Sequence, residues 1–400
     1  MIFVARNTTN SGTSTSECFM PLNDFLSPGM KPMPHCHFEF SDSSCLVSNP
    51  VVSVVMPTYN HGRYLREAID GVVSQQTSFP FELIIGDDCS TDGTREIALE
   101  YQKLRPDIIR VLTADTRVGM HENDARIFSA VRAPYMAFCE GDDYWDRTDK
   151  LTRQVAILES HPQASLVCSS WRIVSDSGIV LDPDALGLDR IRPHCLDLHD
   201  VLRGHVKTVT VCARTAVIQK ALRESPLCKL GRYPFGDAPL WVEASRAGDC
   251  ICLPHEYATY RLSRDSVTRP RDLMGVYRFI AAASEFDRDV LGLYELRQGD
   301  GLAASVRIQA TRKRLRALAF LGEASKVREE ITWLLRLGAK VRLRDYLLYA
   351  ASIVSQPGTL GETSRRWALV AWHSVAHRRV PTMPRNERAQ RTSHLAKETL

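Results

Sequence analysis

Three short clusters of polar residues in the first half of the chain have the composition of a ligand-binding site. They are Pro57-Thr58-Tyr59-Asn60, Gly86-Asp87-Asp88 and Glu140-Gly141-Asp142-Asp143. The adjacent carboxylates Asp142 and Asp143 suit a hard divalent cation such as Mg²⁺ or Mn²⁺, which takes oxygen ligands and commonly bridges protein carboxylates to substrate phosphates. Asp87 and Asp88 can accept hydrogen bonds from a base or a ribose hydroxyl. Any one cluster alone could be an ordinary turn, because Asp, Asn and Gly are common turn residues.

Each cluster follows a predicted strand. Short runs rich in β-branched and apolar residues predict strands at 51–56, 81–86, 108–112 and 135–139, and helical spacing of apolar residues predicts helices between them. Alternating strands and helices favour an α/β fold with a mostly parallel, doubly wound sheet and helices on both faces. Ligands of such sheets bind outside the carboxyl ends of the strands, so the three clusters should meet at one edge.

The rest of the chain divides by composition. We expect a poorly ordered segment at 1–49, the α/β domain at 50–270, a helical C-terminal region at 271–380 and a polar tail at 381–400. Within the helical region, 306–321 and 327–337 have amphipathic spacing. Neither a GxGxxG nor a GxxxxGK[ST] fingerprint is present, so phosphates need another charge partner.

Composition excludes several classes of protein. The chain has 400 residues, 44% hydrophobic and 24% charged, as globular proteins do. No stretch reaches 18 uncharged apolar residues, and the first thirty residues lack the layout of a secretion signal. The eleven cysteines include no CxxC pair, which favours buried thiols in a reducing, cytoplasmic compartment.

The charge is unevenly distributed. Residues 301–400 carry 19 Lys and Arg against 7 Asp and Glu, a net charge of +12, whereas residues 1–300 carry 32 against 40, a net of −8. No recognition motif accompanies the basic charges, so we expect no nucleic acid partner. Two readings stay open: peripheral contact with an anionic membrane, or a solvated helical surface on which Leu334, Leu335 and Leu337 pack against the α/β domain.

The motifs also carry a family resemblance. The run from about 52 to 171 resembles glycosyltransferase family 2, the inverting enzymes of GT-A fold. Gly119, Met120, Asn123 and Arg126 fit the helix that precedes the metal-binding strand in these proteins. The matching motifs, in order and at the right spacings, are Ser53-Val54-Val55-Met56-Pro57-Thr58-Tyr59-Asn60, Ile85-Gly86-Asp87-Asp88-Cys89-Ser90-Thr91-Asp92-Gly93-Thr94 and Phe138-Cys139-Glu140-Gly141-Asp142-Asp143-Tyr144-Trp145.

The resemblance implies a role for each cluster. Tyr59 and Asp88 would contact the nucleotide base, Asp142 the ribose or diphosphate, and Asp143 would help to hold Mg²⁺ or Mn²⁺ together with Asp142. The family's usual Asp-x-Asp stands here as Glu140-Gly141-Asp142, which leaves open whether Glu140 touches the nucleotide. The full set expected at the nucleotide is Pro57, Thr58, Tyr59, Asp87, Asp88, Asn123, Glu140 and Asp142.

A second match lies at 236–241. Family members commonly carry an acidic residue followed by a catalytic Asp before an apolar helix; here Gly236 replaces the first acid and Asp237 is kept. Asp237 would then be the general base, although an N-terminal helix position also suits an Asp. Tyr260-Arg261 and Ser266-Val267-Thr268 resemble the tail that closes the domain, with Ser263 where the family often has His. We expect His61, His121 and His205 to be structural or at the surface.

Together these features imply an inverting glycosyltransferase. It would move a sugar from a nucleoside-diphosphate sugar, with a UDP-sugar as the default, to a hydroxyl of a glycan or glycolipid in surface polysaccharide or glycolipid synthesis. A non-catalytic nucleotide-binding protein would lack the metal pair or the base. A nucleotidyltransferase would usually show a Gly-rich first loop, which 57–63 is not.

Overall fold

The computed structural model describes residues 37–181, 195–202, 204–263, 272–294, 301–336 and 338–354. The chain divides into two compact units, the first formed by residues up to 180 and 191–268, the second by 181–190 and residues from 269 on. The domain boundaries expected above stay predictions. The predictions for residues 1–36, Ser266-Val267-Thr268, Leu337 and the polar tail concern residues outside the described ranges.

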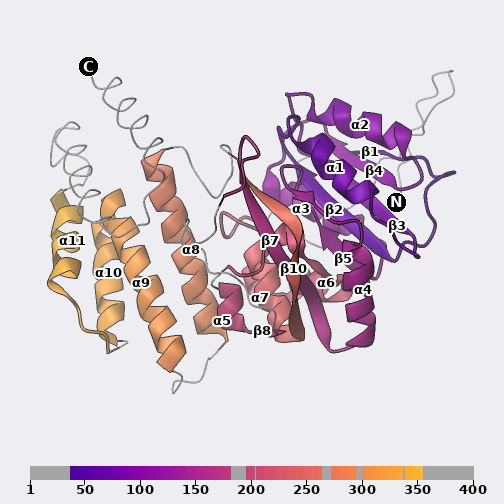
Figure 1. Ribbon diagram of the computed structural model, residues 1–400. Helices are drawn as coiled ribbons and strands as arrows, with labels where there is room; N and C mark the ends of the chain where they lie inside the picture. The colour runs from indigo at the N-terminus through magenta and orange to yellow at the C-terminus, as the bar shows by residue number, and fades with distance from the viewer. Residues whose placement is uncertain are drawn as a thin grey trace, which may run out of the picture. The chain divides into compact units, whose positions relative to one another are not determined.

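The first unit is built on one mixed, mostly parallel sheet, as expected for a GT-A-like α/β fold (Figure 1). Its strands lie in the order β1-β4-β3-β2-β5-β9-β7-β10-β6, with β8 paired to β10. The strands β4, β3, β2 and β5 are parallel, whereas β9 runs antiparallel between β5 and β7. The strand bounds are β1 His37–Phe40, β2 Val52–Thr58, β3 Phe81–Asp87, β4 Ile109–Ala114, β5 Tyr135–Phe138, β6 Tyr144–Trp145, β7 Ala164–Ser175, β8 Cys195–Leu196, β9 Cys212–Arg214 and β10 Asp249–Leu262.

The chain order places the three polar clusters at a topological switch point. The chain passes from β2 to β3 to β4 on one side, and then returns to lay β5 against the other side of β2. The carboxyl ends of β2, β3 and β5 therefore lie at the same edge, where ligands of doubly wound sheets bind. The four parallel strands carry nearly continuous apolar runs because both faces of the sheet are covered.

Helices cover this sheet, and their apolar spacing explains which side they bury. In α1 the buried residues Leu65, Ala68, Ile69 and Val72 recur at intervals of three and four. The helices predicted between the strands are confirmed within a few residues at their ends. The helical elements of the first unit are α1 Leu65–Val73, α2 Thr94–Leu104, α3 Met120–Ser129, α4 Lys150–Ser160, α5 Leu198–Leu202, α6 Thr215–Glu224 and α7 Asp237–Ala247, with short 3₁₀ turns at Thr208–Thr210 and Pro226–Cys228.

The sequence reading missed strand β1. It lies inside the segment expected to be poorly ordered, yet it pairs antiparallel with β4 at the edge of the sheet. Glu39 on β1 receives two hydrogen bonds from Arg110, at 2.7 and 3.1 Å, and Arg110 also pairs with the buried Glu82. This long-range ion pair fixes a four-residue strand whose own pattern is too short to stand out.

The second unit is helical, as predicted. Its helices share a core around Leu315, Leu318, Val327 and Leu334. Leu334 is therefore buried within the helical unit itself, while Leu335 is 56% exposed. Among the described residues, no helix is long and apolar enough to cross a membrane. The helices are α8 Leu273–Leu293, α9 Gly301–Leu321, α10 Ala324–Arg336 and α11 Leu343–Val354.

Candidate active site

The loops that follow β2 and β3 are tied to each other. Asn60 adopts a left-handed backbone conformation, with φ of +54°, which Asn tolerates better than most residues. In that position its backbone N–H donates to Ser90 Oγ at 2.9 Å, and its side-chain oxygen accepts from the Thr91 N–H at 3.0 Å. The Gly62 N–H donates to Asp92 Oδ2 at 2.9 Å. The two motifs therefore form one rigid wall at the sheet edge.

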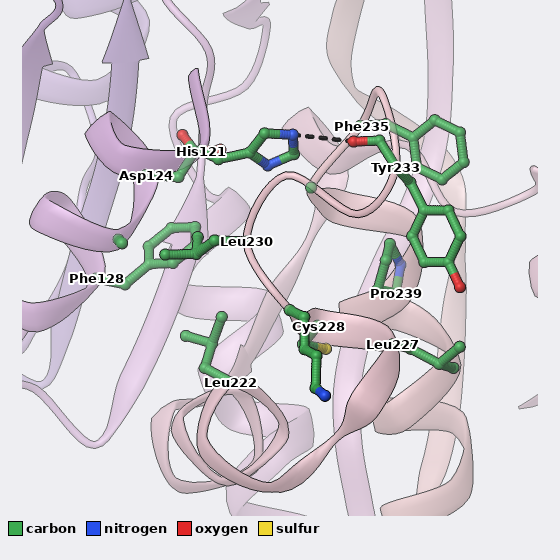
Figure 2. Close-up of a pocket in the computed structure, with 13 residues that line it drawn as sticks. His121, Asp124, Phe128, Leu222, Leu227, Cys228, Leu230, Tyr233, Phe235 and Pro239 are labelled. Carbon is green, nitrogen blue, oxygen red and sulfur yellow. Dashed lines mark hydrogen bonds between the residues drawn. The ribbon is translucent and has the colours of Figure 1, made fainter. Parts of the chain in front are cut away.

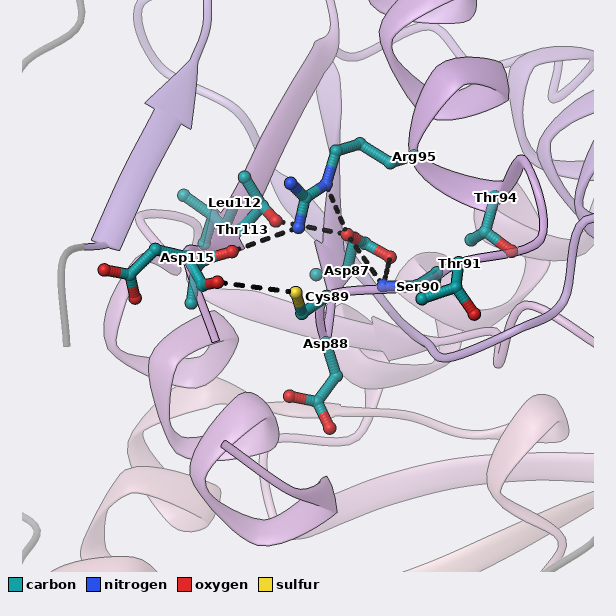
Figure 3. A network of polar contacts seen from close by, with 12 residues as sticks. Asp87, Asp88, Cys89, Ser90, Thr91, Thr94, Arg95, Leu112, Thr113 and Asp115 are labelled. Carbon is teal, nitrogen blue, oxygen red and sulfur yellow. Dashed lines mark hydrogen bonds and ion pairs between the residues drawn. The ribbon is translucent and has the colours of Figure 1, made fainter. Parts of the chain in front are cut away.

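Asp87 lies inside this wall (Figure 3). Its buried carboxylate accepts from the Ser90 N–H at 3.1 Å, from Arg95 Nε at 2.8 Å and from Thr113 Oγ1 at 3.1 Å. Arg95 also donates to the Ala114 carbonyl at 3.0 Å. The side chain expected to touch the nucleotide thus holds the loop that carries its neighbour.

Asp88 points away from that network (Figure 3). Its carboxylate accepts from the Val118 N–H at 2.7 Å and the Gly119 N–H at 3.0 Å. Arg117 lies 3.5 Å from Asp88 and stacks 3.8 Å above the centre of the Tyr59 ring. Tyr59 and Asp88, the two residues expected to contact the nucleotide base, are therefore neighbours. Both contact Arg117, whose side chain is 59% exposed.

Asn123 and Arg126 support the end of β3 from helix α3. Asn123 Nδ2 donates to the Gly86 carbonyl at 2.8 Å, and Arg126 Nη2 donates to the Asp87 carbonyl at 3.0 Å and to Asn123 Oδ1. A Cβ on Gly86 would stand 2.2 Å from Ile127 Cδ1, so this glycine lets the helix approach the strand. The expected nucleotide contact of Asn123 stays a prediction, since its amide is buried in this contact.

The loop after β5 packs closely on the loop after β2. The Gly141 N–H donates to the Pro57 carbonyl at 3.1 Å. A Cβ at Gly141 would stand 2.7 Å from Thr58 Oγ1 and 2.9 Å from His61 Nδ1, distances that real Cβ atoms do not show. Glycine is therefore required between the two acids, and His61, expected to be structural or at the surface, is brought to the site.

Asp142 and Asp143 have different surroundings. Asp143 is 3% exposed, and its Oδ1 accepts from the Arg261 N–H of β10 at 2.7 Å. Asp142 is more accessible; its Oδ2 accepts from Ser263 Oγ at 3.0 Å and its Oδ1 lies 4.0 Å from His61 Nδ1. Ser263, in the position where the family often has His, therefore contacts the metal motif directly. Of the two carboxylates expected to bind metal, Asp142 is the better placed.

Glu140 contributes an unpaired acidic group. Its Oε2 is buried without a hydrogen-bond partner among the described residues. Burial, and then the nearby charges of Asp142, Asp237 and Asp124, raise the pKa of Glu140 to about 8. A cation placed beside Glu140 and Asp142 would relieve this repulsion, so the residues present fit a hard divalent ion. No group of three or more His, Cys, Asp or Glu able to hold a metal occurs in the described ranges, so substrate oxygens would have to complete the coordination.

Asp237 is the first residue of α7, and a contact from the neighbouring turn orients it. Asp237 Oδ2 accepts from Thr208 Oγ1 at 2.6 Å, and Oδ1 accepts from the Ala238 N–H at 2.8 Å. The helix is anchored by Trp241, which is 2% exposed and packs edge-on against Phe138 of β5 with ring centres 5.0 Å apart. The base expected from the resemblance is thus fixed to the strand that leads into Glu140.

Two polar groups at the site escaped the sequence reading. Thr208 has no motif around it, and only its fold position brings it to Asp237. Asp124 follows Asn123 on α3 and makes no hydrogen bond or ion pair among the described residues. Burial, then the charges of Asp237 and Asp88, raise the pKa of Asp124 to about 7. An acidic residue near the start of a helix is ordinary, so the signal lay only in its distance from Asp237 in the fold.

The chain is similar to known proteins along most of its length. The sequence profile described as Glycosyl transferase family 2 matches residues 53–220. The uncharacterized protein Rv1520 of Mycobacterium tuberculosis is 31% identical over 334 residues, which cover 82% of this chain and 87% of that protein. WfgD of Escherichia coli, named as UDP-Glc:alpha-D-GlcNAc-diphosphoundecaprenol beta-1,3-glucosyltransferase, is 28% identical over 150 residues, 36% of this chain and 56% of WfgD.

Among solved structures, residues 1–349 of Staphylococcus aureus TarS in complex with UDP-GlcNAc give a TM-score of 0.49 at 15% identity, covering 81% of this chain and 91% of that one. The profile match spans β2, β3 and β5 with the polar cluster that follows each, and the match to the mycobacterial relative is longer than the first unit. This chain belongs to glycosyltransferase family 2 and is a glycosyltransferase.

Proposed function

We propose that the chain transfers a sugar from a nucleoside-diphosphate sugar to a hydroxyl acceptor by a single displacement with inversion. The observation that carries the proposal is the placement of Asp237. Thr208 holds this carboxylate on the strand-end side of the sheet, within electrostatic reach of Glu140. The site therefore offers one oriented general base, Asp237, beside the acidic residues Glu140 and Asp142.

The displacement needs a base because an alcohol is a poor nucleophile. Asp237 would accept the proton of the acceptor hydroxyl as its oxygen bonds to the anomeric carbon. The bond from that carbon to the diphosphate oxygen breaks at the same time, and its electron pair leaves with the nucleoside diphosphate. A positioned base of this kind contributes ~10²–10⁴-fold. Since no second carboxylate attacks the sugar in this scheme, the configuration at the anomeric carbon inverts.

Asp142 and Glu140 are the residues that would hold Mg²⁺ or Mn²⁺. Such an ion, when bound, supplies charge that stabilises the departing diphosphate. Asp143 would support the metal site without binding the ion. It accepts a hydrogen bond from the Arg261 N–H, which fixes the loop, and Arg261 Nε donates to the Asp142 carbonyl at 3.0 Å. We therefore revise the expected ligand set toward Asp142, with Asp143 as a positioning residue.

Tyr59 and Asp88 would contact the base of the nucleotide, and Pro57 and Thr58 would lie beside it. Arg117 would have to move from the Tyr59 ring or stack on the incoming base, and its exposed side chain is free to do either. The name of WfgD gives UDP-glucose as its donor and a diphosphoundecaprenol-linked sugar as its acceptor. We propose the same classes here, a UDP-sugar and a glycan or glycolipid, in polysaccharide or glycolipid synthesis.

A donor panel tests the proposal. UDP-, GDP- and dTDP-sugars would be incubated with chelator-treated protein, with and without Mn²⁺, and the released nucleotide would be identified. We expect nucleoside diphosphate from one nucleotide class, only with metal. Formation of nucleoside triphosphate and sugar 1-phosphate when pyrophosphate is added would indicate a nucleotidyltransferase, and undiminished turnover in chelator would contradict the metal-dependent scheme.

A further inference from the structure

The first turn of α7, which carries Asp237, is not closely packed on every side. Toward α3 and α6 it borders a cavity of about 30 Å³, with room for a few water molecules (Figure 2). Gly236, the residue before Asp237, lies in the wall of this cavity. Packing on that side therefore leaves the direction of the Asp237 side chain open, and the hydrogen bond from Thr208 Oγ1, at 2.6 Å, becomes the more important restraint.

Thr208 is the first residue of a 3₁₀ turn whose next two carbonyls are bound by buried side chains. Trp145 Nε1 donates to the Val209 carbonyl at 2.9 Å, and Gln154 Nε2 donates to the Thr210 carbonyl at 2.8 Å. Both donors belong to buried residues. Because a buried carbonyl is costly to leave without its donor, these two contacts fix the turn relative to β6 and α4.

Lys150 fixes the orientation of the Gln154 amide. Gln154 Nε2 faces two carbonyls, that of Val167 at 3.0 Å and that of Thr210, and a carbonyl can only accept. The amide oxygen therefore faces Lys150 Nζ, which lies 2.8 Å away and, as an ammonium group, can only donate. Lys150 Nζ also lies 4.1 Å from the centre of the Trp145 ring, so one cation contacts both side chains that hold the turn.

The ammonium group of Lys150 is unusual for its position. The residue is fully buried, and burial lowers its pKa to about 8. An apolar side chain of similar length would fill the same space without the cost of desolvating a charge. It would not donate to Gln154 Oε1, however, and the amide would lose the contact that orients it. The cation is therefore better explained by the geometry it imposes than by the stability of the core.

We propose that Trp145, Gln154 and Lys150 are positioning residues for the general base. They act through the 3₁₀ turn, whose first residue, Thr208, donates to Asp237. The inference rests on the proposed function and deepens it, because it names residues that hold the base in place without contacting the substrate.

The same network links the base to the proposed metal site. Trp145 closely follows Asp142 and Asp143 in the chain, so the segment that carries these acids also supplies one of the donors to the turn. The positions of the base and of the acidic residues are therefore set together. This matters for catalysis because a misplacement of about 1 Å at a reacting centre can cost ~10²-fold in rate.

Three substitutions test the network in the full-length protein. Gln154→Met removes both donations to carbonyls, and Trp145→Phe removes one donor while keeping an aromatic ring beside Lys150. The control, Thr215→Val, removes another buried hydrogen bond of the first unit, from Thr215 Oγ1 to the Ala133 carbonyl at 2.7 Å. We expect kcat to fall roughly tenfold in Gln154→Met and several-fold in Trp145→Phe, with the KM for the donor nearly unchanged. The control should keep the kcat of the wild type.

A double-mutant cycle with Thr208→Val separates positioning of the base from a general loss of structure. If Gln154 acts through the Thr208 hydroxyl, Gln154→Met should lower kcat little further in the Thr208→Val background. Trp145→Phe, the milder change, replaces Gln154→Met in the cycle if melting curves show that the latter is unfolded.

The inference is overturned if the substitution lowers kcat by the same factor in both backgrounds, if it leaves kcat unchanged, or if Thr215→Val loses as much kcat. Failure of the proposed function is seen separately, as a wild-type kcat in Asp237→Asn.

Discussion

The two sides of the site differ in how their acids are paired. On the nucleotide side, Asp87 and Asp88 accept hydrogen bonds from backbone and side-chain donors that tie the loops together. On the transfer side, Glu140 Oε2 is buried without a partner among the described residues, and burial together with the charges of Asp237 and Asp88 raises the pKa of Asp124 to about 7. One side is a hydrogen-bonded frame, and the other gathers acidic groups so closely that burial and their mutual repulsion raise the pKa of Glu140 to about 8.

We infer from this difference that the nucleotide side positions the donor and that the transfer side carries out the reaction. Acids that are already hydrogen-bonded hold the shape of the site, and the proposed contact of Asp88 with the nucleotide base would use the remaining lone pairs of its carboxylate. Acids that repel one another destabilise the empty site and are relieved by a cation or by hydroxyl donors, which is common where function competes with stability. Substitutions on the two sides should therefore fail in different ways.

The largest effect on activity is expected from substitution of the proposed general base, Asp237. Asp237→Asn should lower kcat by ~10²–10⁴-fold while the KM for the donor stays nearly constant, because the lost interaction is made only in the transition state. Steady-state kinetics with the donor identified by the panel would measure both. Thr208→Val removes the hydroxyl that orients Asp237 and should show a smaller loss of kcat. A collapse of donor affinity in Asp237→Asn would instead make Asp237 a donor-binding residue.

The next effect concerns the metal. Asp142→Asn should abolish transfer and weaken Mn²⁺-dependent binding of nucleoside diphosphate, measured by calorimetry. Asp143→Asn should also lower transfer, but mainly by loosening the contact with Arg261, so its loss should be accompanied by a lower melting temperature. Equal metal affinity in Asp142→Asn and the wild type would remove Asp142 from the proposed ligand set.

Stability should distinguish the two sides. Asp87→Asn leaves Arg95 without its charged partner and should lower the free energy of unfolding by about 1.5–3 kcal/mol. Asp142→Asn removes one charge from a repelling cluster and should be neutral or stabilising. Urea unfolding of both variants measures the contrast. Equal destabilisation by the two would contradict the division into a frame and a charged centre.

The smallest effect is expected in the helical unit. Leu334 is buried in the core of that unit, but Trp333 and Leu335 on α10 are 37% and 56% exposed beside Arg336. If this surface meets an anionic membrane, each basic residue near it contributes ~1 kcal/mol, screened by salt. We expect co-sedimentation with anionic vesicles that fades at high salt and is absent from neutral vesicles. Equal, negligible binding to both would end this proposal.

The sheet and its ligand-binding edge could be predicted because strands buried on both faces carry unmistakable apolar runs, and because the motifs follow them directly. The position of Asp237 could be predicted from the resemblance. Asp124 and Thr208 could not, since each reaches the site by long-range packing and carries no local signal. Neither could the inward turn of Asp143, because it depends on a strand more than a hundred residues later. Strand β1 was missed for the same reason.

The stereochemistry of transfer tests the central claim most directly. With an α-linked nucleotide sugar as donor, ¹H NMR of the newly formed glycoside reports its anomeric configuration. A single displacement assisted by Asp237 predicts a β-linked product, absent or greatly slowed in Asp237→Asn. An α-linked product would show retention and would contradict both the single displacement and the role proposed for Asp237.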